Sequence, residues 1–306
     1  MKPAATPRDA VAIGVFDGLH VGHQAILARA IERARERGGR AVVLSFDPHP
    51  DVVLRKDAFH IPAPLTPALE KRARLSALGI DVVDVLPFTR EMASLTPEEF
   101  VGRHVVAPYA PHAVVVGEGF ALGRARSGDV TRLGAIGRGH GFTVEAVPLA
   151  MFEAEPVSST RIRAALAGGR VGPAARLLGR RYDLRGLVVR GDGIGRRLGY
   201  PTANLRLHEE KLLPRDGIYA ALAGIDDEPV CRPAAMSLGI RPTFEGTVRT
   251  LEAHLLDFDE PLYGRDLTVE LVDWLRPEER FDGPEALIRA IDADVAETRR
   301  RLAGVA

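Results

Sequence analysis

The spacing of apolar residues divides the chain into two parts. In roughly the first 160 residues, apolar runs typical of buried strands alternate with stretches whose apolar residues recur at helical spacing. Strands are expected at residues 10–16, 41–46, 80–86, 112–116 and 143–147, and helices at 24–37, from 66, at 96–105, at 129–138 and from 158. The helix from 66 is expected to have a Thr66 cap and a first-turn proline. Strands that alternate with helices predict βαβ units and therefore a parallel, Rossmann-like sheet.

The second part has shorter apolar runs that are rich in β-branched and aromatic residues. They predict strands at 184–189, 217–223, 234–238, 250–258 and 267–275, followed by one long helix at 285–302. This spacing is typical of a small β-barrel or sandwich. The glycine and proline residues at 167–173 predict a linker before a short helix at 174–178. We therefore expect an α/β protein with domains at 1–168 and 182–306 and a linker at 169–181.

Composition narrows the classes of function. The 41 basic and 41 acidic side chains cancel, so no global field favours nucleic acid or an anionic membrane surface. The one cysteine, Cys231, cannot form an internal disulfide, which fits a reducing compartment. The first nine residues lack the apolar core of a signal peptide, and no apolar run approaches the ~18 residues of a membrane span. These features predict a cytoplasmic protein.

The first candidate site is the turn between the first strand and the first helix. His20 and His23 lie three residues apart where the helix begins, so both imidazoles can approach an anion together with the free N–H groups of that helix. Gly18 and Gly22 leave room for a phosphate to reach the backbone. The alternative is that one histidine caps the helix and the other is merely exposed. A zinc site is disfavoured because no third ligand is suggested nearby.

A second helix start carries hydroxyls and arginines, in residues 158–163. Ser158 and Ser159 can cap the helix while Arg161 and Arg163 reach an anion; the alternative is a plain cap with exposed arginines. Parallel sheets bind ligands beyond the carboxyl ends of their strands, where both turns are expected. No lysine follows a glycine-rich turn, so the GxxxxGK[ST] phosphate loop is absent from the sequence. Two such helix starts in one domain favour the phosphates of ATP as the ligand.

The glycine-rich stretch 191–205 is the candidate site of the second part. It is not a dinucleotide fingerprint, because Arg196 stands where the third glycine is needed. Thr202 and Asn204 offer neutral oxygens suited to a magnesium ion that also binds phosphates; the alternative is a polar turn that enters a strand. Glu252 lies on an expected strand, where a glutamate taken alone is usually a solvated side chain.

Taken together, these motifs resemble those of the bacterial bifunctional riboflavin kinase/FMN adenylyltransferase family. Residues 14–23 are similar to the His-x-Gly-His signature of nucleotidylyltransferases, and residues 158–163 to their second phosphate-binding element. Residues 46–50 and 117–129 resemble the FMN adenylyltransferase module, in which the proline-rich turn lies against the flavin ring. Residues 191–205 and 251–264 resemble the riboflavin kinase signature and the segment that holds its catalytic base.

The resemblance implies two reactions, with the barrel phosphorylating riboflavin to FMN and the first domain adenylylating FMN to FAD with release of pyrophosphate. It implies ATP as co-substrate, Mg²⁺ as cofactor, and flavins as substrates and products. The implied catalytic residues are His20, His23, Arg163 and Glu252, and the implied magnesium ligands are Thr202 and Asn204. The implied ATP-binding residues are Gly14, Phe16, Asp17, Gly18, Gly22, Ser159, Thr160, Arg161, Gly191, Gly193, Gly195, Thr202 and Asn204. The implied flavin-binding residues are Phe46, Pro48, Pro50 and Phe120.

One loop departs from the family pattern. Gly119 and Leu122 stand where relatives commonly carry a polar residue and a second aromatic residue. This departure motivates two alternatives, a flavin-binding regulatory protein with a decayed adenylylation site and an enzyme that keeps only the kinase activity. A nucleic-acid-binding barrel is a third alternative, disfavoured by the zero net charge.

Overall fold

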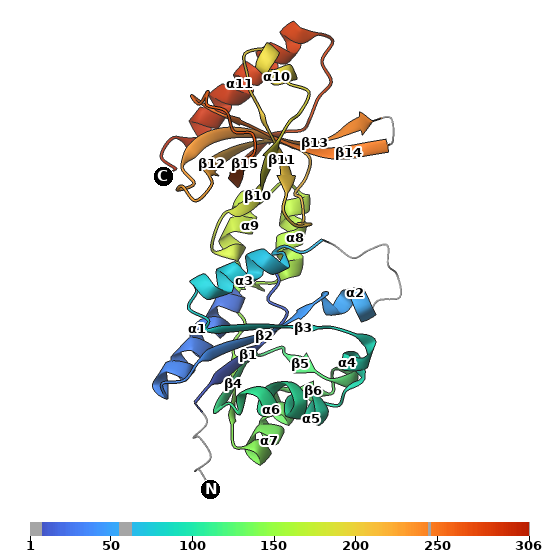
Figure 1. Cartoon of the computed structure of the whole chain (residues 1–306), viewed down its shortest axis with the longest axis vertical. Helices are drawn as coiled ribbons and strands as arrows, with labels where there is room; N and C mark the ends of the chain where they lie inside the picture. Colours follow the sequence, from blue (N-terminus) through green and yellow to red (C-terminus); the bar gives the residue numbers. More distant parts are fainter. Residues whose placement is uncertain (1–7, 55–62, 244–245, 306) are drawn as a thin grey trace. The chain divides into compact units, whose positions relative to one another are not determined.

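The computed structural model describes residues 8–54, 63–243 and 246–305. Contacts along the chain divide it into two compact units, Met1–Ser159 and Thr160–Ala306. The division falls inside one helix, α8 (Ser159–Ala167). Each unit is described by itself below (Figure 1).

The first unit contains a five-stranded parallel sheet in the order β3-β2-β1-β4-β7. Its strands are β1 (Ala10–Ile13), β2 (Ala41–Asp47), β3 (Val82–Pro87), β4 (Ala113–Gly117) and β7 (Thr143–Val147). The predicted parallel sheet is thus confirmed. The first strand was predicted too long, because the chain leaves the sheet after Ile13 and Phe16 adopts a positive φ of 52°.

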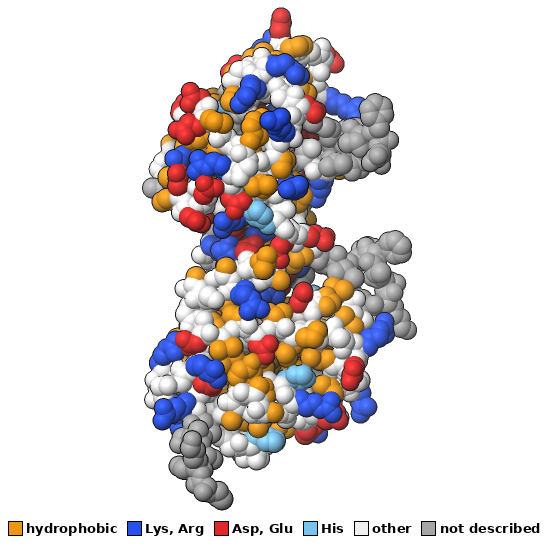
Figure 2. Space-filling view, in the orientation of Figure 1, with side chains coloured by type: hydrophobic (Ala, Val, Ile, Leu, Met, Phe, Trp, Pro, Cys, Tyr) orange, Lys and Arg blue, Asp and Glu red, His pale blue; other side chains and the backbone are white. Residues whose placement is uncertain are grey.

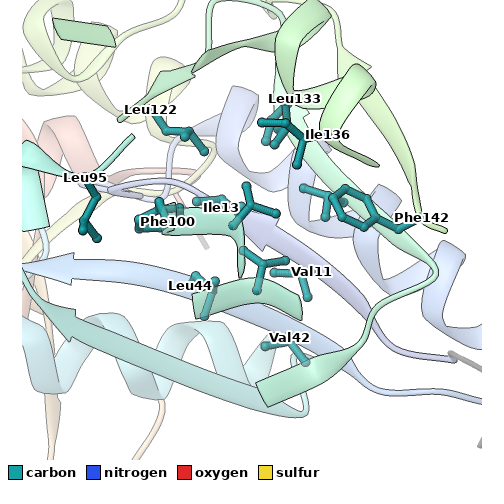
Figure 3. Close-up of a cluster of buried hydrophobic side chains, with 14 residues drawn as sticks. Val11, Ile13, Val42, Leu44, Leu95, Phe100, Leu122, Leu133, Ile136 and Phe142 are labelled. Atoms are coloured by element: carbon teal, nitrogen blue, oxygen red, sulfur yellow. The ribbon is translucent and has the colours of Figure 1, made fainter. Parts of the chain in front are cut away.

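Alternate residues of each central strand face opposite sides of this sheet. Ala10 and Ala12 of β1 pack with α1 (Val21–Glu36) and α3 (Ala68–Ala77). The small alanine side chains let these helices approach the sheet closely. Val11 and Ile13 point the other way, into the larger cluster in Figure 3. Two hydrophobic layers therefore hold the sheet between helices, as expected of a doubly wound fold.

Several helix ends in the first unit follow the sequence signals. At the start of the helix predicted from 96, Thr96 and Glu99 form a capping box, and at the start of the helix predicted from 129, Asp129 caps α7. Thr66 does not cap α3: its hydroxyl has no hydrogen-bond partner among the described residues, and the N-cap is Pro67. The remaining elements are α2 (Pro50–Leu54), α4 (Arg90–Ser94), α5 (Pro97–Phe100), η2 (Val101–Val106), α6 (Ala107–Tyr109), β5 (Ala121–Leu122), η3 (Arg124–Arg126), β6 (Gly128–Asp129), α7 (Val130–His140), β8 (Met151–Phe152) and β9 (Glu155–Pro156).

The second unit is a closed antiparallel barrel in the order β10-β11-β14-β13-β12-β15. Its strands are β10 (Tyr182–Val189), β11 (Ala203–Leu207), β12 (Gly217–Ile225), β13 (Arg232–Thr243), β14 (Gly246–Leu255) and β15 (Asp266–Arg276). The barrel alternative is confirmed over the sandwich. Strand β11 was missed by the sequence analysis, although without it β10 and β14 would not be joined.

Helices accompany the barrel at its beginning and at its end. The long helix α11 (Pro284–Leu302) packs against β12, β13 and β15, as predicted. The short helix α10 (Ile194–Arg197) lies in the glycine-rich stretch. Residues 171–173, predicted as part of a linker, instead form the first turn of α9 (Val171–Leu178), where a proline is tolerated because that turn needs no N–H donor. Four apolar residues of α9 are buried: Val171, Ala174, Leu177 and Leu178.

The surface carries both signs of charge. Figure 2 shows acidic and basic side chains interspersed over the visible face of each unit. None of the helices in the described part of the chain is long and apolar enough to cross a membrane.

Candidate active sites

The turn between β1 and α1 has an unusual backbone that brings its side chains close together. Phe16 and Leu19 have φ values of 52° and 44°, and each is only 1% exposed. Positive φ is uncommon for residues other than glycine and persists only where the surrounding structure enforces it. Between them, Gly18 has a φ of 86°. The turn is therefore a tightly specified structure, a property expected of a site that must hold a ligand in one position.

His20 and His23 lie face to face at the start of α1. Their ring centroids are 3.5 Å apart with an interplanar angle of 16°. His20 Nδ1 accepts a hydrogen bond from the backbone N–H of His23 at 3.2 Å, so the capping alternative is correct for His20. Gly22 permits this arrangement, because a Cβ there would lie 3.3 Å from His20 Nδ1. With Nδ1 as an acceptor, a neutral His20 carries its proton on Nε2.

His23 is held as a neutral imidazole. Burial, followed by the positive charges of His20 and Lys71, lowers the pKa of His23 well below its usual value. Phe16 meets the ring edge-on at a centroid distance of 5.4 Å. Within the described part of the chain, His23 Nδ1 is buried and has no hydrogen-bond partner. A buried neutral imidazole of this kind is suited to donate a hydrogen bond to a phosphate rather than to carry a charge.

Asp17 links the two motifs that were expected to bind phosphate. Its backbone carbonyl accepts a hydrogen bond from Ser159 Oγ at 2.8 Å, 142 residues further along the chain. Its carboxylate, 4% exposed as a residue, accepts from the backbone N–H groups of Leu65 and Thr66 at 2.9 and 3.2 Å. Ser159 thus lies against the histidine-bearing turn. Thr160, Arg161 and Arg163 follow it on α8, in the second compact unit.

A lysine that was not among the predicted site residues also donates a hydrogen bond to this turn. Lys71 of α3 is 8% exposed, and its Nζ donates to the Val15 carbonyl at 3.0 Å. Ser45 Oγ donates to the same carbonyl at 3.0 Å. The sequence did contain a signal for Lys71, because it precedes the buried Leu75 by one helical turn and so lies on the inward-facing stripe of α3.

The residues expected at the flavin lie along β2 and the loop after β4. Phe46 is half-buried, stacks edge-on with Phe88 at 5.7 Å and packs, like Phe120, against the cluster of Figure 3. Pro48 follows β2, and Pro50 begins α2. Leu122, one of the two departures from the family pattern, is a core residue of this cluster, 8% exposed. A Cβ at the other departure, Gly119, would meet open space.

In the barrel, the predicted kinase residues converge on two adjacent strands. Asn204 of β11 lies directly opposite Glu252 of β14, and Thr202 Oγ1 donates to Glu252 Oε2 at 3.1 Å. Gly191 lies so close to Asn204 that a Cβ at that position would collide with the amide. A bulkier residue at 191 would therefore displace Asn204, which explains the glycine in physical terms.

Two cavities meet at Thr202. The smaller, of about 50 Å³, is lined by Gly191, Gly193, Thr202 and Asn204 together with Arg196 and Tyr263. The larger, of about 320 Å³, contains Thr202, Gly195 and Glu252. The smaller cavity combines glycines, a hydroxyl, an amide and a guanidinium, which suit a phosphate-bearing ligand, with apolar side chains such as Leu255 and Phe258 and with the carboxylates of Asp259 and Glu260.

The larger cavity has an apolar body and a charged rim. Its apolar lining comes from β12, β13, α10 and α11: Ile194, Ile218, Met236, Leu287 and Ile291. At the rim Arg276 forms a bidentate pair with Asp294 at 2.8 and 2.7 Å, and Glu278 accepts from Ser237 Oγ at 2.8 Å. These apolar lining residues were not predicted as site residues. The only sign of them in the sequence was the helical spacing of the apolar residues in the last helix. A flat, largely apolar molecule with a polar edge matches such a cavity.

The oxygens of Thr202 and Asn204 suit a magnesium ion that is also bound by a substrate. Thr202 and Asn204 supply two neutral oxygens, and the described residues contain no group of three His, Cys, Asp or Glu side chains able to hold a metal. Mg²⁺ commonly completes its octahedral shell with water and substrate phosphates, so two protein oxygens fit an ion that arrives with a nucleotide.

Comparisons with known proteins agree with this division. The family model for FAD synthetase matches residues 2–161, and that for riboflavin kinase matches residues 178–302. A bifunctional riboflavin kinase/FMN adenylyltransferase from Pseudomonas fluorescens is 41% identical, with 94% of this chain and 91% of that protein covered. Proteins of the same name from Listeria monocytogenes and Escherichia coli are 36% and 35% identical, covering 94% of this chain and 91% and 90% of theirs.

A solved structure resembles the whole chain. It is titled a macrolide-efflux protein from Streptococcus pneumoniae, is 32% identical and has a TM-score of 0.86, with 97% of this chain and 96% of that chain covered. Both family models match in the order in which the two units follow one another, and the relatives match over nearly the full length. The chain therefore belongs to the bifunctional riboflavin kinase/FMN adenylyltransferase family.

Proposed function

We propose that this chain carries out both reactions of its family with residues of its own two units. The barrel phosphorylates riboflavin to FMN with ATP, and the parallel-sheet unit adenylylates FMN with ATP to give FAD and pyrophosphate. The observation that carries the kinase assignment is the contact between Thr202 and Glu252 where Thr202 lines both a small glycine-bordered cavity and a larger, mainly apolar one.

In the kinase reaction, ATP occupies the smaller cavity and the flavin ring the larger one. Glu252 accepts the proton of the ribityl 5′-hydroxyl as that oxygen bonds to the γ-phosphorus and ADP leaves. Thr202 and Asn204 hold the magnesium ion, whose charge offsets that of the phosphates. Gly191, Gly193 and Gly195 let the backbone lie close to the nucleotide.

In the adenylylation reaction, an oxygen of the FMN phosphate attacks the α-phosphorus of ATP and pyrophosphate leaves, with no protein nucleophile. His20, His23 and Arg163 stabilise the charge on the α-phosphate, and Gly14, Gly18, Gly22, Ser159, Thr160 and Arg161 complete the ATP site. Phe16 and Asp17 act through the backbone they fix, because the ring is buried and the carboxylate binds two N–H groups. Phe46, Pro48, Pro50 and Phe120 lie against the flavin.

Separation of products by chromatography tests both assignments. The protein is incubated with riboflavin, ATP and magnesium, and separately with FMN, ATP and magnesium. We expect FMN and FAD from the first mixture and FAD from the second. Accumulation of FMN without FAD indicates a kinase only, and tight flavin binding without any product indicates a regulatory protein.

Two further expectations belong to the same proposal. The functional limits are 1–168 for adenylylation and 182–306 for the kinase, joined by 169–181; expression of the two pieces, each assayed for its own reaction, tests these limits. The location is cytoplasmic, which detection of the protein in fractionated cells tests.

A further inference from the structure

Lys71 is a buried charged side chain for which the mechanism above has no use. It lies on the inward face of α3 and is 8% exposed. Removing an ammonium group from water is costly unless the surrounding groups compensate it. A lysine at this depth therefore needs an explanation beyond solubility, and its contacts supply one.

The contact of Lys71 leads directly to the histidine-bearing turn. Its Nζ and Ser45 Oγ, each at 3.0 Å, donate to the same carbonyl, that of Val15. This peptide leads into Phe16, whose φ of 52° is costly for an aromatic residue. The two hydrogen bonds to the Val15 carbonyl fix the orientation of the peptide group between Val15 and Phe16, on which the positive φ of Phe16 depends.

Phe16 in turn positions His23. A Cβ on Gly14 would lie 3.0 Å from the Phe16 ring, so a larger residue at position 14 would press the ring out of its present place. The same ring meets His23 edge-on at 5.4 Å, while His20 stacks on His23 at 3.5 Å. A displacement of the Val15 carbonyl would therefore move Phe16 and, with it, the imidazole.

The charge of Lys71 also acts on this site. Asp17 and Asp47 attract the ammonium and oppose the lowering of its pKa that burial causes. On the other side Lys71 and His20 repel a proton on His23, adding to the effect of burial on the pKa of His23. The charged and titratable neighbours are therefore Asp17 and Asp47, which affect the pKa of Lys71, and His20 and Lys71, which affect the pKa of His23.

We propose that Lys71 is a positioning residue of the adenylylation site. Its buried ammonium group fixes the Val15 carbonyl by a hydrogen bond and places a positive charge near the histidine pair. The inference rests on the proposed role of His20 and His23 in FMN adenylylation. It assigns a task in that reaction to a residue outside both phosphate-binding motifs.

The test compares Lys71→Met with Arg72→Met in the full-length protein. Arg72 is the next residue of α3, is exposed and donates only to the Val83 carbonyl at 3.2 Å among the bonds described. We expect kcat for FAD formation from FMN to fall about tenfold to a hundredfold in Lys71→Met, the loss typical of one hydrogen bond from a charged donor. Riboflavin phosphorylation by the same preparation should not change.

A second readout separates positioning from a merely structural role. NMR titration of the His23 imidazole, assigned with His23→Gln, should show a higher pKa in Lys71→Met than in the wild type, because a neighbouring positive charge is gone. Loss of packing that admits water would raise the pKa of His23 in Lys71→Met as well, so the pKa must also rise in Lys71→Gln, which keeps a polar side chain in this place; a rise in Lys71→Met alone overturns the inference. If Lys71→Met does not fold, Lys71→Gln keeps an N–H donor without the charge and should still raise the pKa of His23.

The results separate a failure of the proposed function from a failure of the inference about Lys71. If His23→Ala still forms FAD at the wild-type rate, the proposed function of the histidine pair is wrong. If His23→Ala is inactive while Lys71→Met matches Arg72→Met in both kcat and the His23 pKa, the inference about Lys71 is overturned. An unchanged His23 pKa in Lys71→Gln overturns it equally.

Discussion

Replacement of Glu252 by glutamine isolates the proton-accepting step of the kinase reaction. Glu252 Oε2 accepts from Thr202 Oγ1 at 3.1 Å, and glutamine offers an amide oxygen of the same size at the same place. The backbone of β14 pairs with β11 and β13 irrespective of this side chain. Glu252→Gln therefore retains the backbone pairing and an acceptor for Thr202, and it removes the negative charge and the ability to take a proton.

The expected size of the effect follows from that role. A positioned general base typically contributes a factor of about 10²–10⁴ to the rate, or roughly 3–5 kcal/mol of the barrel's transition-state stabilisation at 1.36 kcal/mol per factor of ten. The stability of the fold should change by less than about 1 kcal/mol, since one hydrogen bond to a hydroxyl is weakened rather than removed. We thus expect a large loss of kcat for FMN formation in a folded protein.

The same cavity offers a matched control. Glu278 also lines it and accepts a hydrogen bond from Ser237 Oγ at 2.8 Å, so Glu278→Gln makes the identical chemical change without touching Thr202. Initial rates of FMN formation from riboflavin are measured for both variants, with FAD formation from supplied FMN as the internal standard. A fall of less than tenfold in Glu252→Gln, or an equal fall in Glu278→Gln, would refute the assignment of the base.

Three further outcomes are expected. His23→Ala should abolish FAD formation and leave FMN formation intact, measured on one preparation; loss of both activities in a folded protein would contradict the division of labour. Gly119→Asn should fold with a stability within about 0.5 kcal/mol of the wild type, because its Cβ meets open space, and should lower KM for FMN in adenylylation if this loop contacts the flavin. The Arg35 guanidinium, bonded at 2.8 and 3.0 Å, holds the pKa of the Asp81 carboxyl below its ordinary value of 3.8, so this pair stabilises the fold above that pH and the contribution is lost as the pH falls through the lowered pKa. Asp81→Asn should therefore flatten the acid limb of the thermal-stability profile below about pH 4, and an unaltered limb would contradict the pairing.

The parts of the fold that the sequence could predict are those determined by local spacing. Alternating strands and helices predicted the parallel sheet because each element buries its own apolar face. Strand β11 was missed, although residues 203–207 alternate between apolar and polar side chains, because its start lies within the glycine-rich stretch 191–205 and its place depends on pairing with β10 and with β14, about 50 residues further on. Residues 171–173 were assigned to a linker from composition, although a proline in the first turn of a helix is compatible with the helix.

The candidate sites were predictable as motifs but not as contacts. The first motif indicated a phosphate site, yet nothing local to Asp17 showed that its carboxylate would bind the N–H groups of Leu65 and Thr66. The contact between Ser159 and the Asp17 carbonyl spans 142 residues. The parallel sheet predicted that both turns lie beyond the carboxyl ends of the strands, but local spacing does not show which atoms of the two turns meet.

The two sites differ in one chemical respect that follows from their acceptors. A ribityl hydroxyl must lose a proton to become a nucleophile, and in the proposed kinase reaction Glu252, which accepts a hydrogen bond from Thr202, is the group that takes it. A phosphate monoester has a second pKa near 6 and is already largely ionised at neutral pH, so FMN needs no base and a free carboxylate would repel it. The parallel-sheet unit agrees with this requirement: the carboxylate of Asp17 binds backbone N–H groups in the interior, and burial lowers the pKa of the nearby His23 imidazole well below its usual value. The proposed kinase site thus contains a carboxylate because the riboflavin hydroxyl must lose a proton. The proposed adenylylation site contains histidines and no free carboxylate of Asp17 because the FMN phosphate has already lost its proton.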